Sequence, residues 1–220
     1  DEIIKNALPI DNIYMDYFKQ FARDNKVLLL LGSLATRNND KIYNCSFLVN
    51  DEGVVISSYN KIHMFDVKLK NGEHYNESET FNTGEDISLV RLKEQILGHS
   101  ICYDLRFPEL SRILASSGSE ILVVPSAWVK GPMKEEHWFT LNKSRAVENG
   151  CYVIAPNHLG NIYSARSLVV DPYVKIILDM KKRQGLGYVN ISSAVIKKIR
   201  KKLPLLKNRR TDLYTDFSFS

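Results

Sequence analysis

Apolar residues recur at three- and four-residue steps in residues 11–24, a spacing that predicts an amphipathic helix with Asp11 as its cap. A continuous apolar run follows at residues 27–31 and ends at Gly32. Such a run is typical of a strand that is covered on both faces. The chain therefore opens with a predicted helix and a predicted buried strand.

Two further strands are predicted at residues 42–49 and 54–59, because a short turn-rich connection separates them. This antiparallel hairpin delivers Lys61 at its exit. Residues 66–86 are polar and irregular, so we expect a long loop that contains Glu77. Loops of this length are often functional.

The central unit of the chain is a strand, a thiol, a helix and a second strand. Residues 95–101 read as a strand, Pro108 suits the first turn of a helix, and residues 121–124 form a buried-type strand. Cys102 therefore sits on an elbow between strand and helix. A thiol at the carboxyl end of a strand in an α/β protein points into the usual ligand crevice.

The rest of the chain continues the alternation of strands and helices, with no internal repeat and no linker that would divide it. We therefore expect one domain over residues 1–220, a length that a single layered α/β domain commonly reaches. The predicted elements are a loop at 128–135, a helix that carries Trp138, Leu141 and Arg145, strands at 152–155, 167–170, 175–178 and 187–191, and a helix at 192–203.

Composition changes this picture little. Hydrophobic residues make up 44% and charged residues 25%, which excludes a disordered chain. The net charge is +5, and much of the excess lies in residues 197–210. Apolar residues at helical spacing interrupt that basic segment, so we interpret it as a solvated helix face and expect no nucleic-acid partner.

The cysteine count and hydropathy indicate the compartment. Three cysteines cannot form a complete disulfide set, no apolar stretch approaches 18 residues, and residues 1–5 carry no secretory signature. We therefore expect no membrane partner and a reducing, cytoplasmic location.

Cys102 has two interpretations. A free cysteine is most often a small buried hydrophobe. The charged residues Asp104, Arg106 and Glu109 around it favour a reactive thiol instead, whereas Cys45 and Cys151 lie in apolar runs and are interpreted as core.

Histidine chemistry is the weaker alternative. His63 and His137 raise the possibility of a cysteine–histidine dyad, but His63 adjoins Lys61 and His137 begins a helix. No cluster of His, Cys and Asp residues has metal-ligand spacing, so we expect neither a metal nor another cofactor.

Motifs in collinear order from about residue 10 to residue 215 resemble the carbon–nitrogen hydrolase (nitrilase) superfamily, and most closely its Nit-type amidases. The motifs are Ile42-Tyr43-Asn44-Cys45, Lys61-Ile62-His63-Met64-Phe65-Asp66, Glu77, residues 102–109, Pro125-Ser126-Ala127, His137-Trp138, residues 144–149, residues 168–172, Leu203-Pro204 and residues 209–214.

The resemblance implies a four-layer αββα sandwich and a cysteine-dependent amidase. It implies that Cys102 attacks the amide carbonyl, that Lys61 and the backbone N–H of Tyr103 stabilise the oxyanion, and that Glu77 is the assisting second glutamate. Ammonia then leaves, and water cleaves the thioester.

The same motifs place substrate contacts at Arg106, Phe107, His137 and Trp138. Arg106 could bind a substrate carboxylate through two parallel hydrogen bonds, or could form a buried ion pair with Asp104 or Glu109.

The chain departs from the family in two places. The family's general-base glutamate lies in a Pro-Glu step before the first predicted helix, and this chain has no such step. The family also usually has a longer stretch and a glycine between the equivalents of His158 and Ser167, where this chain has only residues 159–166. We therefore expect a chain that lacks an amino-terminal strand-helix-strand and part of the loop near residues 158–166, or else a variant without the base.

Two functions follow from these alternatives. The first is hydrolysis of a small linear ω-amide of a dicarboxylic acid, such as α-ketoglutaramate or deaminated glutathione. The second is a noncatalytic binding or assembly role on the same fold.

Assembly is predicted from the carboxyl-terminal tail. Leu213, Tyr214, Phe217 and Phe219 are unusually apolar for a free end. With the helix after Pro108, they predict a homodimer or a higher even-numbered oligomer, the alternative being a tail that folds onto its own subunit.

Overall fold

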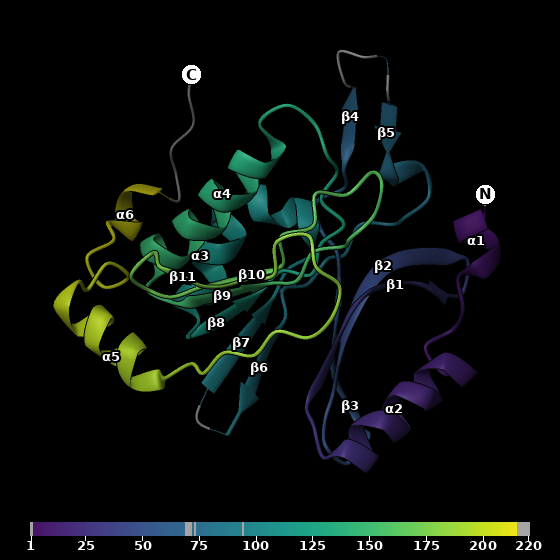
Figure 1. The fold of residues 1–220 in the computed structure, drawn as a ribbon, viewed down its shortest axis with the longest axis horizontal. Coiled ribbons are helices and arrows are strands. Elements are labelled where there is room, and N and C mark those ends of the chain that lie inside the picture. Colours follow the sequence, from purple (N-terminus) through teal and green to yellow (C-terminus); the bar gives the residue numbers. More distant parts are fainter. Residues whose placement is uncertain (1, 69–71, 73, 94, 215–220) are drawn as a thin grey trace.

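The computed structural model describes residues 2–68, 72, 74–93 and 95–214. Two β-sheets pack against each other, and helices cover their outer faces (Figure 1). This arrangement confirms the predicted four-layer αββα sandwich.

The first sheet has three antiparallel strands in the order β1-β2-β3. The second sheet has six strands in the order β11-β10-β9-β8-β7-β6, of which β7, β8 and β9 run parallel and the others antiparallel. The bounds are β1 Leu29–Asn38, β2 Lys41–Val49, β3 Val55–Asn60, β6 Leu89–Leu92, β7 Gln95–His99, β8 Ile121–Val123, β9 Tyr152–Ala155, β10 Leu168–Val170 and β11 Ile176–Asp179.

Helices α2, α3 and α4 lie on the outer faces of the sheets, whereas Ile196 of α5 joins a cluster with Leu97 and Leu30. Helix α2 packs on the first sheet through Met15 and Ala22, which meet Phe47 and Val49 of β2. Helices α3 and α4 pack on the second sheet through a core around Leu114 and Trp138. The bounds are α1 Glu2–Asn6, α2 Ile13–Asn25, α3 Pro108–Ser116, α4 Lys134–Asn149, α5 Ser193–Lys202 and α6 Thr211–Tyr214, with 3-10 helices η1 Glu77–Glu79 and η2 Cys102–Arg106.

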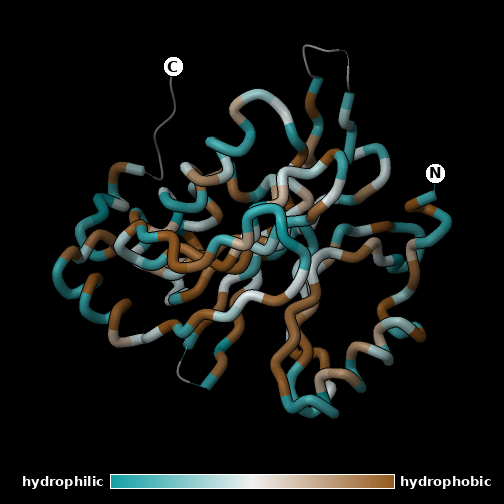
Figure 2. Tube along the Cα trace, viewed as in Figure 1, coloured by the Kyte–Doolittle hydropathy of each residue, from teal (hydrophilic) through white to brown (hydrophobic). Residues whose placement is uncertain are grey.

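The two sheets meet through mixed apolar and polar contacts. Leu30 of β1 joins a buried cluster with Leu97, Ile121 and Val123 of the second sheet. The Ser46 hydroxyl lies 3.1 Å from Nδ1 of His99. Figure 2 shows hydrophobic residues concentrated along the strands of both sheets, where they remove the largest apolar area from water.

Helix α2 confirms the periodicity of residues 11–24, although its cap is Asn12, whose side chain accepts hydrogen bonds from the N–H groups of Tyr14 and Met15. Strand β1 does not end at Gly32 as predicted. It continues to Asn38 because residues beyond the glycine pair with β2 after a register shift between Leu31 and Leu34.

Three other predictions need correction. The predicted loop at residues 66–86 contains the hairpin of β4 (Asp66–Lys68) and β5 (His74–Asn76), followed by η1. Strand β6 was not predicted. Residues 187–191 form no strand, and Tyr188 is 83% exposed, so this apolar segment lacks the neighbour that a strand needs.

The tail begins on its own subunit. Nη1 of Arg209 donates a 2.8 Å hydrogen bond to the Ser116 hydroxyl at the end of α3. Leu213 and Tyr214 of α6 are exposed, and the predicted contacts of Phe217 and Phe219 lie outside the described residues.

Candidate active site

Cys102 lies where the chain turns from β7 into η2. Its φ of 48° is in the left-handed region, where a residue with a Cβ is strained by about 1 kcal/mol or more. Its N–H donates a 3.0 Å hydrogen bond to the carbonyl of Pro125, which follows β8. The strained elbow is therefore fixed to the neighbouring parallel strand, and the thiol is presented at the carboxyl end of the sheet.

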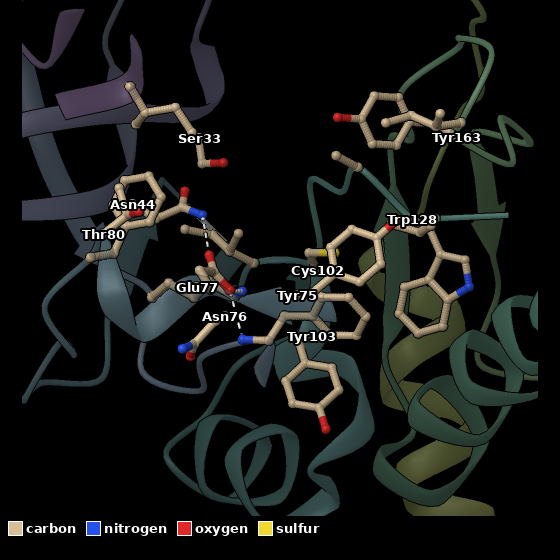
Figure 3. A pocket seen from close by; sticks show the side chains of 18 of the residues that line it. Ser33, Asn44, Tyr75, Asn76, Glu77, Thr80, Cys102, Tyr103, Trp128 and Tyr163 are labelled. Carbon is tan, nitrogen blue, oxygen red and sulfur yellow. Dashed lines mark hydrogen bonds and ion pairs between the residues drawn. The ribbon is translucent and has the colours of Figure 1, made fainter. Parts of the chain in front are cut away.

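The thiol opens into a cavity of about 420 Å³. Figure 3 shows Cys102 among aromatic side chains that include Tyr75, Tyr103 and Trp128. A concave, mostly apolar site with a few polar groups is the usual form of a small-molecule site. The other lining residues are Ile3, Ser33, Asn44, Lys61, Phe65, His74, Asn76, Glu77, Thr80, Phe81, Ile101, Arg106, Ala127, Val129, Lys134, Ile162 and Tyr163.

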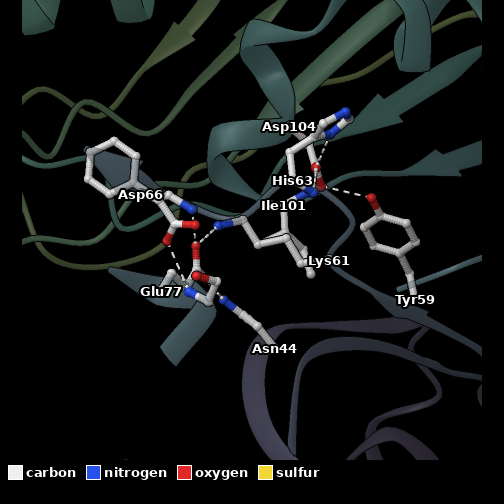
Figure 4. A network of polar contacts seen from close by, with 10 residues as sticks. Asn44, Tyr59, Lys61, His63, Asp66, Glu77, Ile101 and Asp104 are labelled. Carbon is white, nitrogen blue, oxygen red and sulfur yellow. Dashed lines mark hydrogen bonds and ion pairs between the residues drawn. The ribbon is translucent and has the colours of Figure 1, made fainter. Parts of the chain in front are cut away.

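Lys61 and Glu77 form a buried ion pair on the wall of this cavity. The Lys61 side chain is 2% exposed, and its Nζ contacts Oε2 of Glu77. That oxygen also accepts a 2.7 Å hydrogen bond from the N–H of Phe65, while Oε1 accepts a 2.8 Å bond from Nδ2 of Asn44 (Figure 4). The structure therefore brings three predicted residues, Cys102, Lys61 and Glu77, into one cavity.

The environment of the thiol sets its protonation. Burial raises the pKa of Cys102, and the nearby Lys61 ammonium opposes part of that rise. A nucleophilic thiolate therefore requires a base to take the proton. Cys45 and Cys151 lie in the core as predicted, and burial raises the pKa of each to about 12.

Asp104 holds this region together, a role that the sequence did not reveal. Its fully buried carboxylate accepts hydrogen bonds from the Tyr59 hydroxyl at 2.8 Å and the Ile101 N–H at 2.8 Å. It also accepts from His63, through the backbone N–H at 3.1 Å and Nδ1 at 2.7 Å. Asp104 thereby connects β3, the segment after Lys61 and the elbow.

The side chain of His63 has a structural role. Besides its contact with Asp104, its ring stacks on Phe107 with centroids 3.7 Å apart. Neither His63 nor His137 lines the cavity in the described part of the chain. The geometry therefore lends no support to a dyad of Cys102 with either of these two histidines.

Arg106 is the predicted substrate contact that lines the cavity. Its guanidinium lies 4.7 Å from the ring centroid of Trp128, and its Nη2 is 3.5 Å from Nδ1 of His137. Among the described residues it forms no ion pair with Asp104 or Glu109.

The other predicted contacts lie outside the cavity. The ring of Phe107 stacks on that of His63, and His137 is exposed near the start of α4. Trp138 is fully buried, and its indole N–H donates a 2.9 Å hydrogen bond to the carbonyl of Arg166. Its ring centroid lies 5.2 Å from that of Trp128, so Trp138 supports the cavity wall from the core side.

Asn44 and Lys134 are among the cavity residues that the sequence analysis did not name as site candidates. Asn44 was recognised only as part of a motif, and Lys134 fell in the predicted loop at 128–135. No pattern in the sequence indicates that α4 begins at Lys134 and turns this side chain toward Cys102.

A model of the carbon–nitrogen hydrolase family matches residues 1–201. Omega-amidase NIT3 of Saccharomyces cerevisiae is 35% identical over 98% of this chain and 75% of its own length. The deaminated glutathione amidase of Rattus norvegicus is 37% identical over 94% of this chain and 66% of its own length. The chain thus spans about two thirds to three quarters of these relatives.

Solved structures agree with the sequence comparison. Yeast Nit3, described as a member of branch 10 of the nitrilase superfamily, superposes with a TM-score of 0.85 at 30% identity, covering 96% of this chain and 78% of that one. The C. elegans NitFhit protein gives a TM-score of 0.87 at 32% identity, covering 94% and 52%. With its αββα fold and the elbow at Cys102, the chain therefore belongs to the carbon–nitrogen hydrolase family of enzymes.

Proposed function

We propose that this chain hydrolyses the amide bond of a small linear substrate that carries a carboxylate, with Cys102 as the nucleophile. The observation that supports this most directly is the placement of a strained thiol and a buried ammonium, Lys61, in one cavity. One relative is named an omega-amidase and another a deaminated glutathione amidase. We therefore propose an ω-amide such as α-ketoglutaramate, or deaminated glutathione, as the substrate.

In the acylation step, Sγ of Cys102 forms a bond to the amide carbon, and the carbonyl oxygen becomes an oxyanion. The Cys102 N–H is engaged by Pro125, so the donors proposed for this oxyanion are Nζ of Lys61 and the N–H of Tyr103. When the oxyanion collapses, the C–N bond breaks, the nitrogen takes up a proton, and ammonia leaves a thioester behind.

In the second step, water attacks the thioester carbon and the carboxylic acid departs as the thiol re-forms. Lys61 again faces the oxyanion. Glu77 is a positioning residue in this proposal, because its carboxylate holds the side chain of Lys61 in a buried place. Its two oxygens are already occupied by Lys61, Phe65 and Asn44.

Attack by Cys102 requires a base that accepts the thiol proton. Among the described residues that line the cavity, Glu77 is the sole carboxylate. The relatives contain residues without a counterpart in this chain. We propose that the base is a glutamate in an amino-terminal strand-helix-strand outside residues 1–220. In this proposal, that segment and residues 1–220 form one domain.

The competing proposal is a noncatalytic binding protein with the same fold. The observation that favours it is the same engagement of Glu77, which leaves the described cavity without a free carboxylate base. Reading the gene upstream of residue 1 separates the two proposals. A strand followed by Pro-Glu favours the enzyme, and a start at residue 1 favours the binding protein.

Ammonia release tests the catalytic proposal. The protein as its gene encodes it should release ammonia from α-ketoglutaramate or deaminated glutathione, and Cys102→Ala should abolish the release. Arg106→Lys should lower kcat/KM for these carboxylate-bearing amides, because the planar two-point contact is lost. Arg91→Lys is the matched control, because Arg91 is an exposed residue of β6. Unchanged kcat/KM in Arg106→Lys would remove Arg106 from substrate binding.

The location of the protein is also proposed. All three cysteines are free thiols, and the described residues include no helix that is long and apolar enough to cross a membrane. Free thiols are typical of reducing compartments, so we propose the cytoplasm.

A further inference from the structure

Two cations line the cavity without acidic partners. Arg106 and Lys134 are both half-buried there, and neither forms an ion pair with an acidic side chain in the part of the chain that the structure describes. Glu77, the carboxylate of this cavity, is bound to Lys61. Half-buried charges are usually paired, so this pair of cations calls for an anion.

One aromatic side chain contacts both residues, the guanidinium of Arg106 and the backbone of Lys134. The guanidinium of Arg106 lies over the ring of Trp128, and the indole N–H of Trp128 donates a 2.9 Å hydrogen bond to the carbonyl of Lys134. Nζ of Lys134 in turn lies 5.3 Å from the ring centroid of Phe65. Because Trp128 is itself 4% exposed, the two cations stand on a fixed wall of the cavity.

The surroundings of both cations lower their pKa. Burial lowers the pKa of Arg106 and of Lys134, and the charge of Arg106 lowers that of Lys134 further. A negative charge at Cys102 would act in the opposite direction on both. An anion bound between the cations would remove their mutual repulsion.

We propose that Lys134 is a specificity-determining residue that binds, together with Arg106, the carboxylate at the end of the substrate remote from the scissile amide. This inference rests on the proposed function and narrows it to the half-amides of short dicarboxylic acids. Arg106 offers a planar two-point contact, and Lys134 adds a second charge from the start of α4.

A pair of substrates that differ only in the remote charge tests this in turnover. Glutaramate carries the carboxylate, and glutaramide carries a neutral amide in its place. Lys134→Met should lower the ratio of kcat/KM for glutaramate over glutaramide roughly 10- to 100-fold, mainly through KM. Lys134→Arg should restore part of the ratio. Lys143→Met, on the same helix but away from the cavity, should keep the wild-type ratio.

Binding of glutarate tests the same site without catalysis, so it separates this inference from the proposed function. Calorimetry should give a Kd for glutarate that is at least about 10-fold weaker in Lys134→Met than in the wild type and in Lys143→Met. If no amide is hydrolysed, the proposed function fails and the glutarate affinities alone decide. Equal affinities in the wild type, Lys134→Met and Lys143→Met, or no glutarate binding to the wild type, would overturn the inference. If Lys134→Met does not fold, the glutarate affinity of Lys134→Arg decides it.

Discussion

Nζ of Lys61 and Oε2 of Glu77 are in direct contact inside the cavity that holds Cys102. The lysine is 2% exposed, so its charge would be costly there without this carboxylate. The pair joins the exit of β3 to the first residue of η1 and places a positive charge beside the thiol. Glu77 therefore stabilises the site and, in the proposed mechanism, positions the ammonium that faces the reacting carbonyl.

We expect Glu77→Gln to reduce kcat at least about 10-fold, because Lys61 loses the charge that fixes it toward the oxyanion. Glu77→Ala should also cost about 3–5 kcal/mol of unfolding free energy, since it leaves a buried ammonium unpaired. Both effects are measured by steady-state kinetics and urea unfolding. Exposed Glu85→Gln is the control, and wild-type kcat in Glu77→Gln would contradict the assigned role.

Asp104→Asn should destabilise the protein by about 2–4 kcal/mol, because a fully buried acceptor of several hydrogen bonds loses its charge. Tyr59→Phe removes one of these donors and should cost about 1 kcal/mol. Urea unfolding measures both values. Equal losses in the two variants would show that the carboxylate does not connect the elements around the elbow as described.

The sequence predicts those elements whose apolar spacing is continuous, such as α2 and the unit around Cys102. It misplaces the end of β1, because pairing with β2 carries that strand past Gly32. It predicts a strand at residues 187–191 from composition alone, although a strand forms only where a neighbouring backbone accepts its hydrogen bonds.

The same limit applies to the candidate site. Cys102, Lys61 and Glu77 were found through motifs, and the structure places all three in one cavity. Lys134 and the central role of Asp104 depend on contacts between segments far apart in the sequence. Trp138 is an error in the opposite direction. Its motif predicted a substrate contact, but its side chain is fully buried and supports the cavity wall from the core.

Acid should destabilise the protein through His99. Burial lowers the pKa of His99 from 6.5 to about 4, so the folded protein keeps this ring neutral at pH values where the unfolded chain is protonated. Stability from this residue is present above pH 6.5 and is lost as the pH falls toward 4, by about 3 kcal/mol in total. Urea unfolding from pH 7 to 4 should therefore show a flatter pH dependence in His99→Asn, and an equally steep one would contradict this assignment.

We expect the intact protein to be a homodimer or a higher even-numbered oligomer. Ile113 on α3 and Val147 on α4 are exposed, as are Leu213 and Tyr214 of α6, and Arg209 fastens the tail to the end of α3. Light scattering on the intact protein and on a version that ends at Lys207 measures this. A monomeric intact protein would contradict the prediction, and a dimer that survives truncation would confine the contact to the helices.

The central claim is that Cys102 carries the acyl group of the substrate. The most direct measurement is the intact mass of the protein, as its gene encodes it, after mixing with α-ketoglutaramate and quenching in acid. We expect a mass increase equal to the acyl group, located on the peptide that contains Cys102, absent from Cys102→Ala and removed by hydroxylamine. Ammonia release with no acylated Cys102, or undiminished release by Cys102→Ala, would contradict the account.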